Sequence, residues 1–236
     1  MKTITIKEYF DSISYDYKKD QDCLQDILRL TKTRVREGMS RFAFVRGMEQ
    51  TFLMKAIAEN LRVCNFFEIG TGRGTSSYAI SLLTNVEKIV TVDIVPHDQK
   101  KYEAINFKPA LVSNADLFEF INFKQKEKIQ FKHISDYENI LKESADSFDL
   151  CFIDGNHSDY DIIKSDFDIC HKLIKNQGVI VWDDYVPGKF TVTNVVDDVI
   201  KEHGFESTLI QCAGHLFKND QPPEKDRGIV LMKIKK

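Results

Sequence analysis

Three glycines at alternate positions, directly after an apolar run, are the residues that most clearly indicate a ligand-binding site. The run, residues 64–69, contains one acid, Glu68. The glycines are Gly70, Gly72 and Gly74. Glycines let the backbone approach a ligand closely, and a helix that begins behind such a turn offers free N–H groups. A second apolar run, 89–92, ends in Asp93, at the distance where a nucleotide-binding βαβ unit places an acid for the ribose. The pattern predicts a site for a nucleotide-like ligand, with a tight turn that binds nothing as the alternative.

Carboxylates follow two other apolar runs and suggest a metal site. Residues 148–153 lead into Asp154, and residues 178–182 lead into Asp183 and Asp184. If both runs are neighbouring parallel strands, their ends lie roughly 5 Å apart, at the edge where α/β folds bind ligands. Three carboxylates at that spacing repel one another unless a cation compensates, and an all-oxygen set suits Mg²⁺ or Mn²⁺. The sequence therefore predicts a divalent-cation site.

The same acids also have plainer interpretations. In a regular strand Asp183 and Asp184 would point to opposite faces, so both bind one ion only if the chain turns at Asp184. A proline-glycine pair just beyond them favours such a turn. In the alternative, Asp184 only stabilises the turn, and Ser158 or Asp159 caps a helix that begins near residue 160.

Helical and strand patterns alternate from residue 63 onward, which favours a mainly parallel sheet with helices on both faces. The predicted strands are 64–69, 88–93, 129–134, 148–153, 178–183, 205–212 and 227–234. The predicted helices are 75–83, 114–124, 136–143, 159–175 and 190–203. The last two strands have no helical pattern between them, so we expect an antiparallel hairpin at the end of a seven-stranded, Rossmann-like α/β sheet.

The N-terminal quarter of the chain has a different pattern. Residues 1–63 show helical spacing of apolar side chains, interrupted between Gly38 and Phe44. A segment of this size is too small to form a core alone. We therefore expect a helical extension that packs on a second unit, residues 64–236, which contains the ligand site.

Composition narrows the class of protein further. The 236 residues carry a formal net charge of −3, without a basic block beyond Lys235 and Lys236, which argues against nucleic acid as the main partner. The chain has no apolar leader at its start and no run of eighteen apolar residues, so we expect a cytoplasmic protein that contacts no membrane. Its five cysteines include no C-x-x-C pair and predict no disulfide framework.

The E-x-G-x-G-x-G pattern that starts at Glu68 resembles the first motif of the Rossmann-like methyltransferases that use S-adenosylmethionine (SAM). In that family the turn lies under the methionine end of SAM, and the acid after the second strand binds the ribose. The resemblance implies that Asp93 binds the ribose and that Asp154 borders the cofactor. It implies that Ser135 and Asp136 contact the adenine, unless they only cap the helix behind them. On the methionine side it implies Glu68, Gly70, Thr71, Gly72, Gly74 and Ser76.

The tetrapeptide that starts at Asp154 and the tripeptide that starts at Asp183 resemble the macrocin type of metal-dependent O-methyltransferases. In that type, one acid after the fourth strand and a pair after the fifth hold Mg²⁺, which implies Asp154, Asp183 and Asp184 as ligands. Several members have an aspartate as the base where this chain has Asn156, and an amide cannot accept that proton. Others use a histidine close behind, which implies His157 as the base.

These features predict a Mg²⁺-dependent enzyme that transfers the methyl group of SAM to a hydroxyl of a small molecule, such as a sugar or natural product. The resemblance extends over residues 47–200. In related enzymes, N-terminal helices cover the active site or form a dimer contact, so residues 1–63 are expected to form a lid or a contact in a homo-oligomer. Two alternatives are an NAD-linked oxidoreductase, whose G-x-G-x-x-G turn and Tyr-x-x-x-Lys pair are not evident, and a non-catalytic SAM-binding protein.

Overall fold

The computed structural model describes residues 1–31, 43–103, 111–217 and 228–236. Its longer strands are β1 (Lys2–Thr5), β2 (Asn65–Ile69), β3 (Lys88–Asp93), β6 (Ile129–His133), β7 (Phe148–Ile153), β8 (Ile174–Tyr185), β9 (Glu206–Gln211) and β10 (Gly228–Lys233). Two short strands, β4 (Tyr102–Glu103) and β5 (Leu111–Val112), pair with each other. The α-helices are α1 (Ile6–Ser12), α2 (Gln21–Thr31), α3 (Glu49–Asn60), α4 (Thr75–Ser81), α5 (Asn114–Phe118), α6 (Phe123–Lys126), α7 (Tyr137–Ser144), α8 (Tyr160–Leu173) and α9 (Val192–His203). Single 3₁₀ turns, η1 (Tyr17–Asp20) and η2 (Ile134–Asp136), precede α2 and α7.

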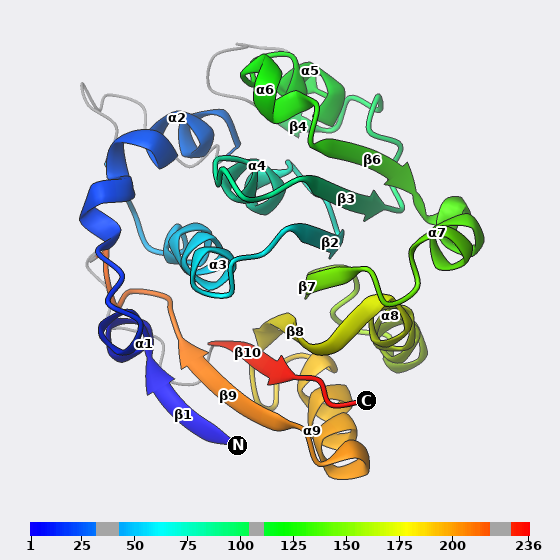
Figure 1. Cartoon of the computed structure of the whole chain (residues 1–236). Helices are drawn as coiled ribbons and strands as arrows, with labels where there is room; N and C mark the ends of the chain where they lie inside the picture. The colour runs from blue at the N-terminus through cyan, green and yellow to red at the C-terminus, as the bar shows by residue number, and fades with distance from the viewer. Residues whose placement is uncertain (32–42, 104–110, 218–227) are drawn as a thin grey trace.

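In the described residues the longer strands form one eight-stranded sheet in the order β1-β9-β10-β8-β7-β2-β3-β6 (Figure 1). Strand β10 runs antiparallel to β8 and β9. The other neighbouring pairs are parallel. This arrangement confirms the Rossmann-like α/β fold and the terminal hairpin.

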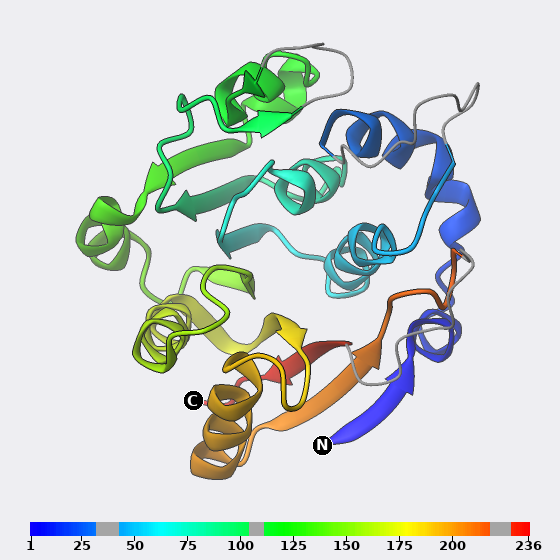
Figure 2. The same cartoon turned by 180° about the vertical axis from the view of Figure 1, so that it is seen from behind.

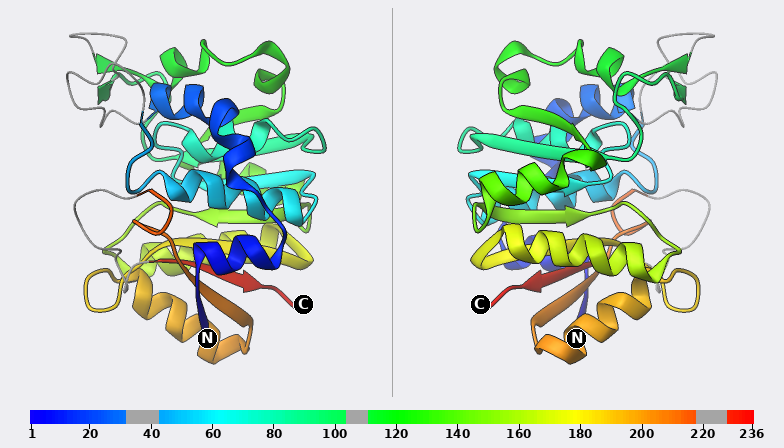
Figure 3. Two further views of the ribbon diagram at one scale, coloured as in Figure 1. Left: turned by 90° about the vertical axis from the view of Figure 1, so that its left-hand side faces the viewer. Right: turned by 90° about the vertical axis from the view of Figure 1, so that its right-hand side faces the viewer.

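Helices cover both faces of the sheet (Figures 1 and 2). Helices α1 to α4 lie on one face and α7 to α9 on the other, as the two side views of Figure 3 show. Because neighbouring side chains of a strand point to opposite faces, Phe66 belongs to the core under α3 and α4, whereas Phe67 belongs to the core under α8 and α9. No helix in the described part is long and apolar enough to cross a membrane.

The N-terminal segment differs from its prediction, because Lys2–Thr5 form a strand rather than a helix. This strand, β1, pairs in parallel with β9 and gives the sheet an eighth member at its edge. Thr3, Ile4 and Thr5 are β-branched and suit an extended backbone. Thr5 then ends the strand, because its hydroxyl accepts the N–H of Glu8 and caps α1. Phe10 of α1 packs in the same core as the sheet, so the extension shares one core with it.

Other helices and strands also begin or end at residues that differ from the prediction. The predicted helix 114–124 is two short helices, α5 and α6, and the Asn122 side chain accepts the N–H of Lys124 near the start of α6. The predicted strand 178–183 is the longer β8, because pairing with β7 and β10 extends it at both ends. Gly38, where the helical pattern was expected to break, and residue 227, where the last strand was expected to begin, lie outside the described residues.

Candidate active site

The turn between β2 and α4 crosses the carboxyl ends of three strands. Gly70 donates its N–H to the carbonyl oxygen of Val92, at 2.8 Å, and has a φ of +94°. A Cβ at this position would lie 2.0 Å from the carbonyl oxygen of Asp154, directly behind β7. Only glycine lets the ends of β2 and β7 approach this closely. The first glycine of the motif therefore brings the turn against the residues that follow β7.

Glu68, near the end of β2, connects the elements on either side of the turn through hydrogen bonds. Its carboxylate is fully buried and accepts hydrogen bonds from the hydroxyls of Ser77, in α4, and Thr91, in β3, both at 2.6 Å. Burial raises the pKa of Glu68 to about 7, although both hydroxyls favour the charged form. Glu68 therefore ties β2 to the start of α4 and to β3, at the floor of the site.

Asp93 closes the turn from the side of β3. One of its carboxylate oxygens accepts the N–H of Gly72 at 2.8 Å, and the other accepts the N–H of Val95 at 2.8 Å. The amide of Asn114, at the start of α5, donates to the carbonyl oxygen of Gly72 at 2.8 Å. Both polar backbone groups of Gly72 are thus held by side chains, which fixes the turn without a ligand.

A cavity of about 840 Å³ opens between this turn and the start of α8. Its volume suits a cofactor-sized ligand. The predicted cofactor residues that line the cavity are Glu68, Gly70, Thr71, Gly72, Ser76, Asp93 and Asp154. Thr31 of α2, together with Gln50 and Thr51 of α3, also lines it, so the N-terminal extension forms part of the wall.

Three predicted cofactor residues do not line the cavity and have local contacts instead. Gly74 precedes α4 with a φ of +77°. The hydroxyl of Ser135 lies 3.0 Å from Nδ1 of His133, and the carboxylate of Asp136 accepts the His133 backbone N–H at 3.1 Å. Ser135 and Asp136 therefore shape the 3₁₀ turn η2, and Asp136 is the N-cap of α7 without a side-chain cap bond.

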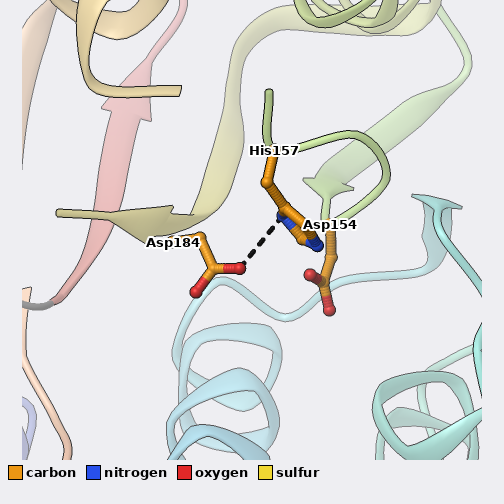
Figure 4. Close-up of side chains that lie close together, drawn as sticks. All are labelled: Asp154, His157 and Asp184. Atoms are coloured by element: carbon orange, nitrogen blue, oxygen red, sulfur yellow. Dashed lines mark ion pairs between the residues drawn. The ribbon is translucent and has the colours of Figure 1, made fainter. Parts of the chain in front are cut away.

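A polar cluster lies at the edge of the cavity, where β7 and β8 end (Figure 4). Asp154, His157 and Asp184 each offer one potential metal-ligand atom, and these atoms lie within 4.8 Å of one another. Nδ1 of His157 lies 3.0 Å from a carboxylate oxygen of Asp184. The Asp184 side chain is 11% exposed and that of His157 is 45% exposed. The structure thus brings together three of the four predicted metal and catalytic residues.

An irregularity in β8 decides which acid joins the cluster. Val230 of β10 pairs with Trp182 and Gly228 pairs with Tyr185, so the two aspartates of β8 stand opposite one residue of β10. Asp184 has a φ of +54°, which is rare for a residue with a side chain. This bulge provides the turn that the sequence required at Asp184. Asp183 lies outside the cluster, and its carboxylate accepts a hydrogen bond from Gln50 of α3 at 2.9 Å.

The loop that carries His157 is held on both sides. The side-chain oxygen of Asn156 accepts the N–H groups of Ser158 and Asp159, both at 2.8 Å. Asp159 in turn caps α8, as one sequence alternative predicted. From the segment behind β8, Thr191 donates its N–H to the carbonyl oxygen of His157 at 3.0 Å. Asn156 therefore shapes the loop that positions the histidine.

Sequence reasoning missed several residues of the site. Asn114 and Gln50 lie far from the motifs in sequence, and their amide side chains give no periodic signal. Tyr137 and Asp166 also line the cavity, from α7 and α8. Asp166 falls in the apolar spacing of α8 beside Ile163 and Phe167, so an acid on a buried helical face was the signal that could have revealed it.

Comparison with known proteins identifies the class. A methyltransferase-domain family matches residues 67–185, about half of the chain, from β2 to the end of β8. No curated protein sequence matches the chain. The chain belongs to this methyltransferase family and is a SAM-dependent methyltransferase. The match decides against the NAD-linked oxidoreductase.

Solved structures share the fold at low sequence identity. An O-methyltransferase from Bacillus cereus in complex with SAH is 14% identical, with a TM-score of 0.57 over 92% of this chain and 96% of that one. TomG from Streptomyces achromogenes, an O-methyltransferase involved in tomaymycin synthesis, is 18% identical, with a TM-score of 0.55 over 97% and 95%. The tRNA (m1A58) methyltransferase TrmI from Aquifex aeolicus is 15% identical, with a TM-score of 0.51 over 90% and 76%. Because these proteins differ in what they methylate, the likeness supports the fold and leaves the acceptor to the site.

Proposed function

We propose that the protein is a metal-dependent O-methyltransferase of the macrocin type, which methylates a hydroxyl group of a small polar molecule. The observation that carries this proposal is the Asp154–His157–Asp184 cluster, which borders the cavity that we assign to SAM. Asp154 belongs to both the cavity wall and the cluster, so methyl donor and acceptor would meet beside it.

The backbone of the glycine turn leaves room for the cofactor. Gly72 has a φ of +51°, and a Cβ at this position would meet no atom within 4 Å, so the turn leaves open space at the position where a ligand would approach. Asp93 lies beside Gly72 and supplies the carboxylate that we assign to the ribose hydroxyls. SAM, when bound, supplies an already activated methyl group, so the protein's residues need only orient the acceptor and remove its proton.

The side-chain atoms of the cluster are of the kinds that bind a divalent cation. Two carboxylates and one imidazole within 4.8 Å are hard or borderline ligands, which suit Mg²⁺ or Mn²⁺ through the oxygens. A cation held there would supply Lewis-acid chemistry that makes an acceptor hydroxyl easier to deprotonate. We assign Asp154 and Asp184 as the ligands, with Asp183 as a neighbour that Gln50 holds.

His157 is the base in this proposal, because of its contact with Asp184. An ionised carboxylate only accepts hydrogen bonds, so the Nδ1 atom that faces Asp184 at 3.0 Å must carry the proton. In the neutral imidazole, Nε2 then has the lone pair that can accept a proton from the acceptor hydroxyl. Asp184 would thus orient the histidine and stabilise its protonated form.

The lining of the cavity and the cluster beside it favour a small hydroxylated acceptor. A hydroxylated small molecule fits a site with carboxylates and a base at the mouth of a cavity whose wall includes Gln50 and Thr51. The net charge of −3 gives no attraction for nucleic acid. We further propose a cytoplasmic protein whose N-terminal helices cover the site or form a homo-oligomer contact.

The decisive experiment measures SAH formation with a panel of sugars, glycosides and phenols, with SAM and Mg²⁺, in the presence and absence of EDTA. We expect turnover that EDTA abolishes and Mg²⁺ or Mn²⁺ restores, and that falls by at least about tenfold in Asp154→Asn and Asp184→Asn. Asp168→Asn is the matched control, because Asp168 is an exposed acid of α8 outside the cavity. Full turnover in EDTA, with both aspartate variants active, would remove the metal from the proposal.

A further inference from the structure

His133, the last residue of β6, lies beside the acid that we assign to the ribose. In the parallel pairing of β3 with β6, His133 stands opposite Asp93, and each of the two is the last residue of its strand. Neighbouring strands of a sheet lie about 5 Å apart, so the histidine is close to the segment that follows β3. Ile94 and Val95 of that segment line the cavity, whereas His133 does not.

The hydrogen bonds of the His133 ring decide which nitrogen carries its proton. The backbone N–H of Ser135 donates to Nδ1 at 3.3 Å, so Nδ1 presents its lone pair. In the neutral ring the proton is then on Nε2. Nε2 lies 3.1 Å from the carbonyl oxygen of Ile94 and donates to it. The imidazole therefore joins the turn η2, behind β6, to the segment behind β3.

A single peptide group connects this histidine to Asp93. The carbonyl oxygen of Ile94 and the N–H of Val95 belong to the same planar peptide unit, so they point in opposite directions. The carbonyl oxygen accepts the hydrogen bond from Nε2 of His133, and the N–H donates to a carboxylate oxygen of Asp93 at 2.8 Å. Any rotation of this peptide group would thus be felt at His133 on one side and at Asp93 on the other.

The Asp93 carboxylate is held at both of its oxygens. The second oxygen accepts the N–H of Gly72 at 2.8 Å, so the glycine turn and the Ile94–Val95 peptide together set the plane of the carboxylate. A group that is already oriented before its ligand arrives loses less conformational freedom on binding, which increases affinity. Without the bond from His133, the peptide would be free to turn and the carboxylate would lose part of this orientation.

We propose that His133 is a positioning residue that orients Asp93 through the Ile94–Val95 peptide and thereby strengthens binding of the ribose of SAM. This inference rests on the proposed assignment of Asp93 to the ribose hydroxyls, and it is independent of the metal, the base and the acceptor.

The test measures binding by isothermal titration calorimetry with two probes, SAH and the SAH analogue whose ribose lacks both hydroxyl groups. Wild-type protein should bind the analogue roughly tenfold more weakly than SAH, because Asp93 then lacks its partners. His133→Ala should bind SAH roughly three- to tenfold more weakly than wild type, the range expected for one hydrogen bond. It should bind the analogue about as tightly as wild type does, so its preference for SAH should fall.

Two conservative variants separate an effect on Asp93 from an effect on the turn η2. His133→Gln should restore most of the preference, because its amide N–H can reach the Ile94 carbonyl in place of Nε2. His133→Asn should resemble His133→Ala, because its oxygen can accept the Ser135 N–H in place of Nδ1 but its shorter side chain does not reach Ile94. His203→Ala is the control, since His203 ends α9 outside the cavity, and it should bind both probes like wild type.

The proposal is overturned if His133→Ala keeps the wild-type preference for SAH. It is also overturned if His133→Asn restores the preference and His133→Gln does not, because His133 would then only shape η2. Equal binding of both probes by wild-type protein would overturn it without any variant, so it stays testable even if the variants do not fold. Failure of wild type to bind SAH at all would instead overturn the cofactor assignment.

Discussion

The turn at residues 70–74 is held by hydrogen bonds from residues within about forty positions of it, whereas the Asp154–His157–Asp184 cluster depends on segments from across the chain. At the turn, Asp93 and Asn114 bond the backbone of Gly72. At the cluster, a bulge opposite β10 turns Asp184 toward His157. The turn is therefore a preformed cradle, while the cluster requires the whole sheet in register.

This comparison predicts that the two regions fail separately. Variants of His157 and Asp184, which do not line the cavity, should retain SAH binding, because the turn keeps its own hydrogen bonds. Variants of the turn should lose SAH binding and, through the Gly70–Asp154 contact, also disturb the cluster.

The largest effect is expected at His157. His157→Ala should reduce turnover about 10²–10⁴-fold, the usual contribution of a general base, while the SAH dissociation constant stays within about twofold. Initial rates of SAH formation and calorimetry with SAH provide the two readouts. Mn²⁺ binding, measured by electron paramagnetic resonance, should persist in this variant. Loss of Mn²⁺ would reassign His157 as a metal ligand, and unchanged turnover would return the search for a base to other residues.

The next effect is expected at Gly70. Gly70→Ala should lower the free energy of unfolding by roughly 2–5 kcal/mol, because the new Cβ has to displace the Asp154 carbonyl and the positive φ strains an alanine. SAH binding should be lost with it. Gly188→Ala is the matched control: its φ is +75° and a Cβ there meets no atom within 4 Å, so only about 1 kcal/mol of strain is expected. Urea unfolding of both variants checks the difference, and equal losses would contradict the steric explanation.

The bulge in β8 predicts a smaller, selective effect on metal binding. Asp184→Asn should weaken Mn²⁺ binding at least tenfold, whereas Asp183→Asn should weaken it by less, because Asp183 lies outside the cluster and accepts a bond from Gln50. Titration of each variant followed by electron paramagnetic resonance gives the two affinities. Equal losses would restore the all-aspartate ligand set that the sequence suggested.

The smallest effect concerns the pH dependence of stability at the base of the turn. Burial raises the pKa of Glu68 to about 7 from an ordinary value of 4.5, so the folded state holds a proton that the unfolded chain releases. Stability from this group is complete below about pH 4.5 and is lost as the pH rises through 7. Glu68→Gln should remove this decline and leave a shallower one from Asp166, whose pKa is also raised to about 7. Urea unfolding between pH 5 and 8 tests this, and parallel curves for both proteins would contradict it.

Much of the architecture followed from local patterns. Buried parallel strands such as β2 and β7 are near-continuous apolar runs, and the helices between them have their own periodicity, so the order of elements was predictable. Lys2–Thr5 was missed because four residues at a sheet edge have too little pattern, and pairing with β9 alone makes them a strand. Asp166 was missed as a site residue: its place on the apolar face of α8 predicts burial, but the packing of α8 beside β7 decides that it borders the cavity.

The sequence by itself determined that glycines would form a tight turn behind β2 and that an acid would end β3, because glycine readily adopts the positive φ that the turn requires and an apolar run marks each strand. It also determined that carboxylates would gather where β7 and β8 end, because parallel strands share one edge. Only the tertiary structure decided which of these carboxylates lie close together. The register of β10 against β8 sets the bulge, the bulge gives Asp184 its positive φ, and this conformation brings Asp184 to His157 while Asp183 bonds to Gln50. Such pairing depends on residues nearly fifty positions apart, which no local pattern records.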